Sequence, residues 1–154
     1  MSSPNITPDD SLDPIQQQEL TNGVARALVN SAPPGWSEIT LDVISLARLT
    51  TIGNWVSRNN NPPEREFFPH SVNNDVIRLR LGMYREGTGT WFSMRMHIIP
   101  PGRFKVEFNY DEKPTYFMPP DPQEFATDFE KFPRSPENIP SWLQEELDHA
   151  SREE

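Results

Sequence analysis

The sequence predicts an α+β domain in which an antiparallel β-sheet of about four strands is packed by an N-terminal helix, a middle helix and short C-terminal helices. Apolar and polar residues alternate over residues 92–98 and again over 104–110, and a Pro/Gly turn at 100–102 joins the two runs. This two-residue period is typical of half-buried strands, and the short turn favours a hairpin. Apolar residues at helical spacing predict the helices. A chain of 154 residues is long enough to bury one core.

The first helix is expected to begin at Pro14, after a disordered arm at residues 1–13. Asp13 can cap this helix. Proline suits the first helical position, because an N–H there has no acceptor within the helix and its absence costs nothing. Apolar residues then recur at helical spacing as far as Ser31, namely Ile15, Leu20, Val24 and Leu28. Residues 33–35, Pro-Pro-Gly, end the helix.

Two strand candidates follow, at residues 36–49 and 50–56. The first becomes apolar on both faces from Val43, which suggests a central strand or a bend. Residues 58–63 form a loop by composition, since they contain three asparagines and two prolines.

A middle helix is predicted over residues 71–86, although the same stretch also shows a strand-like alternation. Its length, its polar start and the glycine at its end favour the helix, with Gly87 as the C-cap. The basic face of this helix carries Arg78 and Arg85, which we expect to balance the acidic C-terminal part of the chain.

Two short helices are predicted after a proline-rich stretch at residues 114–122. The first follows Asp121 and has Phe125, Phe129 and Phe132 on one face. Ser141 caps the second, whose apolar stripe is Trp142, Leu143 and Leu147. The chain is expected to fray from His149. These boundaries predict a disordered arm at 1–13, a single domain at 14–149 and a frayed C-terminus at 150–154.

Charge and composition restrict the possible functions. The chain has 14 basic and 23 acidic side chains, a net charge of −9 that disfavours direct binding to nucleic acid. Residues 121–154 hold ten acids and three bases, which serve either solubility or binding to a basic partner. The absence of cysteine excludes disulfides and a cysteine nucleophile. No apolar run approaches the roughly 20 residues of a membrane helix, and the start lacks a signal-peptide pattern, so we expect a cytoplasmic protein without a membrane partner.

Side chains that could carry catalysis or hold a cofactor form no recognisable motif. His70, His97 and His149 lack metal-ligand spacing, and the sequence has no phosphate loop, dinucleotide-binding glycine motif or nucleophile elbow. We therefore predict no catalytic residue, cofactor or metal. The enzyme alternative would be supported by a deep pocket that holds His97 together with Asp111 or Glu112.

Aromatic and acidic side chains are the candidates for a protein-binding surface. Trp91 falls on the polar face of its strand, where it has no role in the core, and is therefore predicted to face a partner. Tyr110 and Asp111, at the end of the hairpin, either terminate the strand or present a contact. The acidic candidates of the C-terminal part are Glu124, Asp128, Glu130, Glu137, Glu145 and Glu146.

Three segments of the chain together resemble the YezG-like immunity family. They are Pro-Gly-Trp at 34–36 after the first helix, Gly-Thr-Trp-Phe at 89–92, and GRFKVEFNYDEKP at 102–114, which is the most specific. The resemblance covers residues 15–145, with 58–68 loosely matched. The ending FEKFPRSPENIPSWL departs from the shortest members and is similar to a variant found beside actinobacterial toxins, which leaves the type of toxin open.

The resemblance implies a small, acidic, cytoplasmic antitoxin that protects a bacterium from its own secreted polymorphic toxin. The expected partner is a cognate toxin, either a nuclease or an NAD glycohydrolase, bound as a heterodimer and neutralised by stoichiometric occlusion of its active site. An acidic face suits a toxin that binds phosphates through a basic cleft. The alternative is an acidic adaptor or regulatory module that binds a basic protein other than a toxin.

Overall fold

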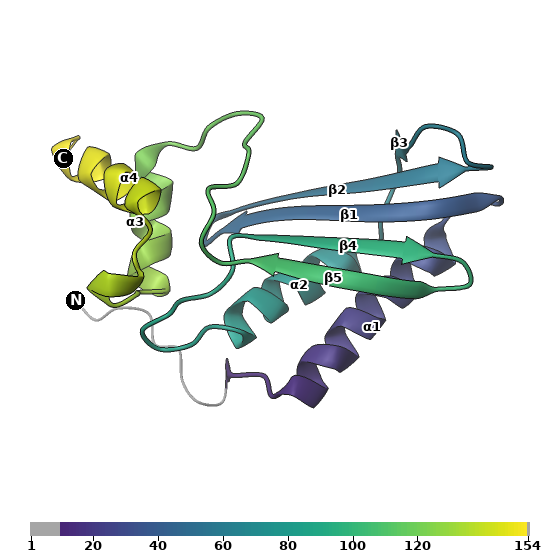
Figure 1. Cartoon of the computed structure of the whole chain (residues 1–154), viewed down its shortest axis with the longest axis horizontal. Helices are drawn as coiled ribbons and strands as arrows, with labels where there is room; N and C mark the ends of the chain where they lie inside the picture. Colours follow the sequence, from purple (N-terminus) through teal and green to yellow (C-terminus); the bar gives the residue numbers. More distant parts are fainter. Residues whose placement is uncertain (1–9, 154) are drawn as a thin grey trace.

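The fold is an antiparallel five-stranded sheet combined with four α-helices, which confirms the α+β prediction (Figure 1). The computed structural model describes residues 10–153. The strands are β1 (Trp36–Leu46), β2 (Leu49–Arg58), β3 (Glu64–Arg65), β4 (Ser93–Ile99) and β5 (Arg103–Asn109), in the sheet order β3-β2-β1-β4-β5. The helices are α1 (Pro14–Ser31), α2 (His70–Gly82), α3 (Pro122–Lys131) and α4 (Ser141–Arg152), with a short 3-10 helix, η2 (Pro136–Asn138), before the last.

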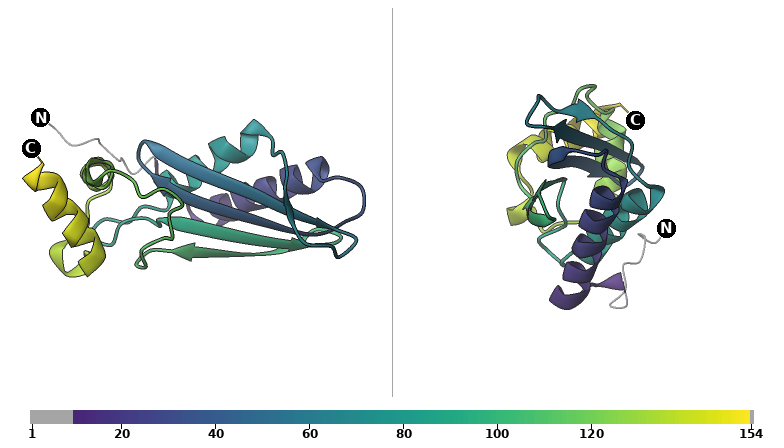
Figure 2. Two further views of the ribbon diagram at one scale, coloured as in Figure 1. Left: turned by 90° about the horizontal axis from the view of Figure 1, so that it is seen from above. Right: turned by 90° about the vertical axis from the view of Figure 1, so that its right-hand side faces the viewer.

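The helices are divided between one face and one end of the sheet. Helices α1 and α2 pack together and cover one broad face, whereas α3 and α4 lie beyond one end of the strands (Figures 1 and 2). The opposite face of the sheet carries no helix among the described residues (Figure 2). We call α3, η2 and α4 together the C-terminal helical layer.

Strand β1 is the centre of the sheet, which was one of the two alternatives that its apolar run suggested. It pairs with β2 on one side and with β4 on the other, both antiparallel. The expected strand at 36–49 ends three residues earlier, at Leu46, because Ala47 and Arg48 form the turn into β2. The predicted β4–β5 hairpin is present, with its turn at residues 100–102. The fifth strand is the two-residue β3, which lies beyond the loop predicted at 58–63.

The main core lies between the sheet and helices α1 and α2. Alternate residues of β1 and β4 point towards the helices and are fully buried, which is the period-two pattern of a sheet with one covered face. Burial of one such side chain contributes about 1.5–3 kcal/mol. The core includes Val24 and Leu28 of α1, Val72, Val76 and Leu79 of α2, Ile39, Leu41 and Val43 of β1, and Met94, Met96 and Ile98 of β4.

Helix α1 begins where the sequence predicted, with a reciprocal cap. The Asp13 carboxylate accepts from the backbone N–H of Gln16, and the Gln16 side chain accepts from the N–H of Asp13. Leu12, which was assigned to the disordered arm, is instead buried, and its N–H donates to the Gly82 carbonyl at 2.9 Å. The arm prediction is therefore wrong for Leu12 and Asp13, and its first nine residues lie outside the described part of the chain.

Helix α2 ends earlier than predicted, at Gly82 instead of 86. Met83 caps it through a bond from its N–H to the Leu79 carbonyl, and Gly87 is part of the turn that follows. Gly87 and Gly89 both have φ near +88°, a conformation that glycine adopts without a steric penalty. The turn leads the chain back towards the sheet, so that Trp91 can enter the core.

The C-terminal helical layer has a second, smaller core against the end of the sheet. Phe125 of α3 and Leu143 of α4 pack with Leu46 and Phe92, so both predicted apolar stripes face inward. Helix α4 continues to Arg152 with Ala150 buried, although fraying was expected from His149. The side chain of Gln123 donates to the Ala150 carbonyl at 2.7 Å and connects the start of α3 to the end of α4.

Candidate protein-binding surface

Trp91 is not exposed, and its prediction as a binding residue is wrong. It is fully buried (0% exposed) in the main core, and its ring centroid lies 5.6 Å from that of Phe108. Strand β4 begins only at Ser93, so the alternation of the strand does not extend back to Trp91. Phe92, which the same alternation assigned to the main core, lies in the smaller core instead.

Asp128 is likewise buried, at 4% exposure, and cannot contact a partner. Its carboxylate accepts two hydrogen bonds from the guanidinium of Arg80, which is also buried. Arg80 also donates from Nε to the Trp91 carbonyl at 2.7 Å. Two buried charges need such complete pairing, because an unpaired one loses its hydration without compensation. This pair connects α2 to α3 and is structural.

Arg80 is thus one of the cations that pair with the acidic layer, whereas the predicted Arg78 and Arg85 are not. The guanidinium of Arg78 donates to the Asp10 carbonyl, and that of Arg85 donates to the carbonyls of residues 12, 82 and 84. Both therefore hold the segment before α1 and the end of α2, not the C-terminal helical layer.

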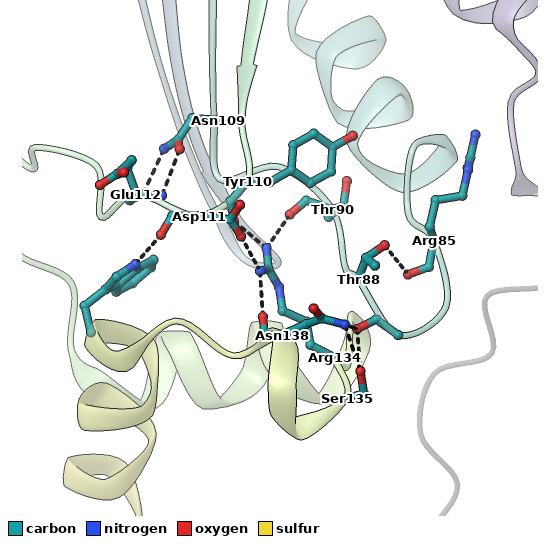
Figure 3. Close-up of polar contacts among 12 residues, drawn as sticks. Arg85, Thr88, Thr90, Asn109, Tyr110, Asp111, Glu112, Arg134, Ser135 and Asn138 are labelled. Carbon is teal, nitrogen blue, oxygen red and sulfur yellow. Dashed lines mark hydrogen bonds and ion pairs between the residues drawn. The ribbon is translucent and has the colours of Figure 1, made fainter.

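Tyr110 and Asp111 lie next to Arg134, a buried arginine that was not among the residues predicted from the sequence (Figure 3). The Arg134 guanidinium donates to the carbonyl oxygens of Tyr110 at 2.6 Å, Thr90 at 3.1 Å and Asn138 at 3.1 Å. It also pairs with the Asp111 carboxylate at 3.3 Å. These contacts fasten the loop after α3 to the end of β5, so the corner has the structural role that was one of its two interpretations.

The Tyr110 ring is half-buried against the main core, while the Asp111 side chain is 79% exposed. Burial raises the pKa of the Tyr110 phenol, and the positive charges of Arg85 and Arg134 oppose that rise. The Asp111 carbonyl accepts from the Trp142 indole at 2.7 Å. Of this corner, the Asp111 carboxylate is therefore fully presented to a partner, and the Tyr110 ring only in part.

The remaining acidic candidates divide into paired and unpaired side chains. Glu124 is bidentate with Arg48, at 3.1 and 3.3 Å, and Glu146 pairs with Lys113 at 3.0 Å. Glu130, Glu137 and Glu145 are exposed and have no ion-pair partner among the described residues. Of the predicted acidic candidates, these three residues on the C-terminal helical layer are therefore accessible and, within the described part of the chain, unpaired, and the Asp111 carboxylate is also exposed.

An exposed apolar pair is the feature that sequence reasoning missed. The chain between β5 and α3, residues 110–121, is called the connector here. It rises from the end of β5 and turns back to α3 (Figure 1). Phe117 is 100% exposed and Met118 77% exposed; together they are called the tip. The sequence features that could have indicated the tip were two adjacent apolar residues in a loop with prolines on each side.

The connector is fastened on both sides of the tip. Before it, Pro114 is buried, and the Tyr116 ring packs edge-on against Phe125 with centroids 6.0 Å apart. Burial raises the pKa of the Tyr116 phenol, whose oxygen has no hydrogen-bond partner among the described residues. After the tip, Asp121 caps α3 by accepting from the Gln123 N–H at 2.9 Å.

A groove of about 660 Å³ runs beside the connector on the uncovered face of the sheet. Asp42, Arg95 and Glu107 line its floor on three adjacent strands, and Pro114 and Thr115 form part of its wall. Asp42 and Arg95 neutralise one another at 3.1 Å. The floor therefore presents one paired acid and base together with the Glu107 carboxylate, which suits polar contacts.

His97 does not lie near Asp111 or Glu112, the arrangement that would support the enzyme alternative. His97 pairs with Glu38 at 2.8 Å, and the residue opposite it, Lys105, lies four positions before Asn109 on β5. That separation is roughly 13 Å along the strand, and Asp111 and Glu112 lie beyond it. The described residues also contain no group of three or more His, Asp or Glu side chains placed to hold a metal ion.

No family model matches the chain, and no curated protein matches it. Among the described residues, no helix is both long and apolar enough to span a membrane.

Proposed function

We propose that this chain is an immunity protein that binds a cognate secreted toxin and neutralises it by stoichiometric occlusion of the active site. The observation that carries the proposal is the set of unpaired carboxylates on the C-terminal helical layer, Glu130, Glu137 and Glu145. A nuclease or an NAD glycohydrolase binds phosphates through a basic cleft, and such a cleft is electrostatically complementary to this surface.

The arrangement of the layer also suits an inhibitor. Its helices are fixed to α2 by the Arg80–Asp128 pair and to the backbone beside the sheet by the contacts of Arg134, so the carboxylates are held in place before binding. A surface that is ordered in advance loses less conformational entropy on association. In this proposal the chain contributes charge and shape, and no catalytic group.

The test is inhibition of the toxin encoded beside this gene. The purified toxin is titrated with the purified chain, and its nuclease and NAD-hydrolysing activities are followed together with co-elution in size-exclusion chromatography. The proposal expects loss of activity that is complete near one equivalent. A toxin that remains fully active at excess chain refutes it. Absence of a neighbouring toxin gene, with specific binding of a basic housekeeping protein, supports the adaptor alternative instead.

A further inference from the structure

The tip combines full exposure with a fixed base, which distinguishes it from an ordinary loop. Single exposed apolar side chains are common and need no explanation. Here two are adjacent, and the backbone around them is restricted by Pro114, Pro119 and Pro120. Tyr116 and Asp121 fasten the connector on the two sides. The tip is therefore presented to solvent between two fastened segments, which reduces the conformational entropy that it would lose on binding.

The charges around the tip indicate what it would contact. Asp111, Glu112 and Asp121 are exposed along the connector, and its one cation, Lys113, is occupied by Glu146. An apolar pair within an acidic surround is complementary to an apolar pocket with basic side chains at its rim. Pro114 and Thr115 also form the wall of the groove, so a partner that receives the tip would cover that groove as well.

We infer that Phe117 and Met118 are the apolar anchor of the complex and insert into a pocket of the toxin that is rimmed by Lys or Arg. The inference rests on the proposed function and deepens it, because it assigns different roles to two surfaces. The carboxylates of the C-terminal helical layer accelerate association, whereas the tip slows dissociation. A large side chain buried at the centre of an interface is the usual form of a binding hot spot.

The experiment measures association and dissociation rates between immobilised chain and the purified toxin encoded beside its gene. Phe117→Ala is compared with Phe67→Ala, which removes the same ring from another highly exposed position (76%) outside the connector. We expect Phe117→Ala to weaken binding by at least about 30-fold, mainly through faster dissociation, since hot-spot residues exceed about 2 kcal/mol. Phe67→Ala should change the affinity by less than about twofold. Thermal unfolding should be unchanged in Phe117→Ala, because a fully exposed ring has no packing to lose.

The possible results separate this inference from the proposed function. If the wild-type chain does not bind the toxin, the proposed function fails and the inference fails with it. If the wild type binds and Phe117→Ala binds equally well, or if both alanine variants lose the same affinity, only the inference fails. If Phe117→Ala instead converts a wild-type dimer into a monomer without changing toxin affinity, the tip contacts a second copy of the chain, and the inference is overturned.

Discussion

The buried pair of Arg80 and Asp128 permits a sharp test of what holds the C-terminal helical layer in place. Asp128→Asn keeps the size of the side chain and removes its charge, which leaves the Arg80 guanidinium buried without a counter-ion. Breaking a buried ion pair from one side costs about 3–5 kcal/mol. Arg80 retains its bond to the Trp91 carbonyl and faces the Phe92 and Phe132 rings at 5.8 and 4.8 Å. These contacts still stabilise the charged Arg80 guanidinium in the variant. We therefore expect the free energy of unfolding to fall by the lower end of that range, about 3 kcal/mol.

Equilibrium unfolding in urea, with thermal unfolding in parallel, measures this cost. For a domain of this size, about 3 kcal/mol corresponds to a fall in Tm of about 6–12 °C. The matched control is Glu130→Gln, the same chemical change two residues away on α3, where the side chain is exposed. It should alter the free energy of unfolding by less than about 0.5 kcal/mol. A loss below about 1 kcal/mol in Asp128→Asn, or equal losses in the two variants, would refute the structural role.

A double substitution, Arg80→Met with Asp128→Leu, separates the charge from the packing. Replacing a buried ion pair by apolar residues of similar volume is often neutral or stabilising. Here the Trp91 carbonyl loses its donor, which costs about 1–3 kcal/mol. We expect the double variant to be at least as stable as Asp128→Asn alone. If it is markedly less stable, the unpaired charge is not the source of the loss.

Three further predictions concern the binding surface and the local packing. Reversing the exposed charges, Glu130→Lys with Glu145→Lys, should slow association with the toxin and make the association rate less dependent on salt, while the dissociation rate changes little. Stopped-flow measurements at two ionic strengths check this, and association rates equal to those of the wild type would contradict it. Tyr116→Phe removes a buried hydroxyl without a partner and should raise the free energy of unfolding by up to roughly 1 kcal/mol at neutral pH. Burial raises the folded-state pKa of this phenol above its ordinary value of 10.0. The phenol therefore leaves the free energy of unfolding independent of pH below about pH 10, and lowers it as the pH rises further, because the phenol then ionises more readily in the unfolded chain. Urea unfolding at pH 8 and pH 11 should therefore show a smaller alkaline loss in Tyr116→Phe than in the wild type, and equal losses would contradict the assignment. Gly82→Ala should destabilise by about 1–3 kcal/mol although alanine is the better helix former, because its Cβ would collide with the Leu12 side chain; a stabilised variant would show that Leu12 does not pack there.

The fold was predictable where local patterns and tertiary packing agree. The capped start of α1 and the alternation in β4 and β5 were both visible in the sequence and are both present. The prediction failed at ends of elements, where a local period no longer applies. Trp91 precedes β4, and the period of the strand assigned it to the wrong face. Leu12 precedes α1, and only the close approach of Gly82 explains why it is buried.

The surface was harder to predict, because net charge does not distinguish exposed acids from paired ones. Glu124 and Glu146 have partners, Arg48 and Lys113, that lie 76 and 33 residues away in the chain. No local pattern indicates such pairs. The tip was missed for a related reason: two adjacent apolar residues in a loop do not show by themselves whether they are buried, and only the path of the connector places Phe117 in solvent.

The burial of Asp128, in contrast, had a signal in the sequence. It lies three residues after Phe125 and four before Phe132, so it shares the apolar face of α3 with both. Arg80 lies four residues after Val76 and one after Leu79, on the inward side of α2. A charge on the apolar face of a helix must be paired if that face is buried. Two opposite charges on two such faces therefore predict a single buried pair, and with it the docking of the C-terminal helical layer against α2. The ten acids of residues 121–154 thus include two kinds of carboxylate: Asp128 holds the layer to α2, and others, such as Glu130, remain free for a partner.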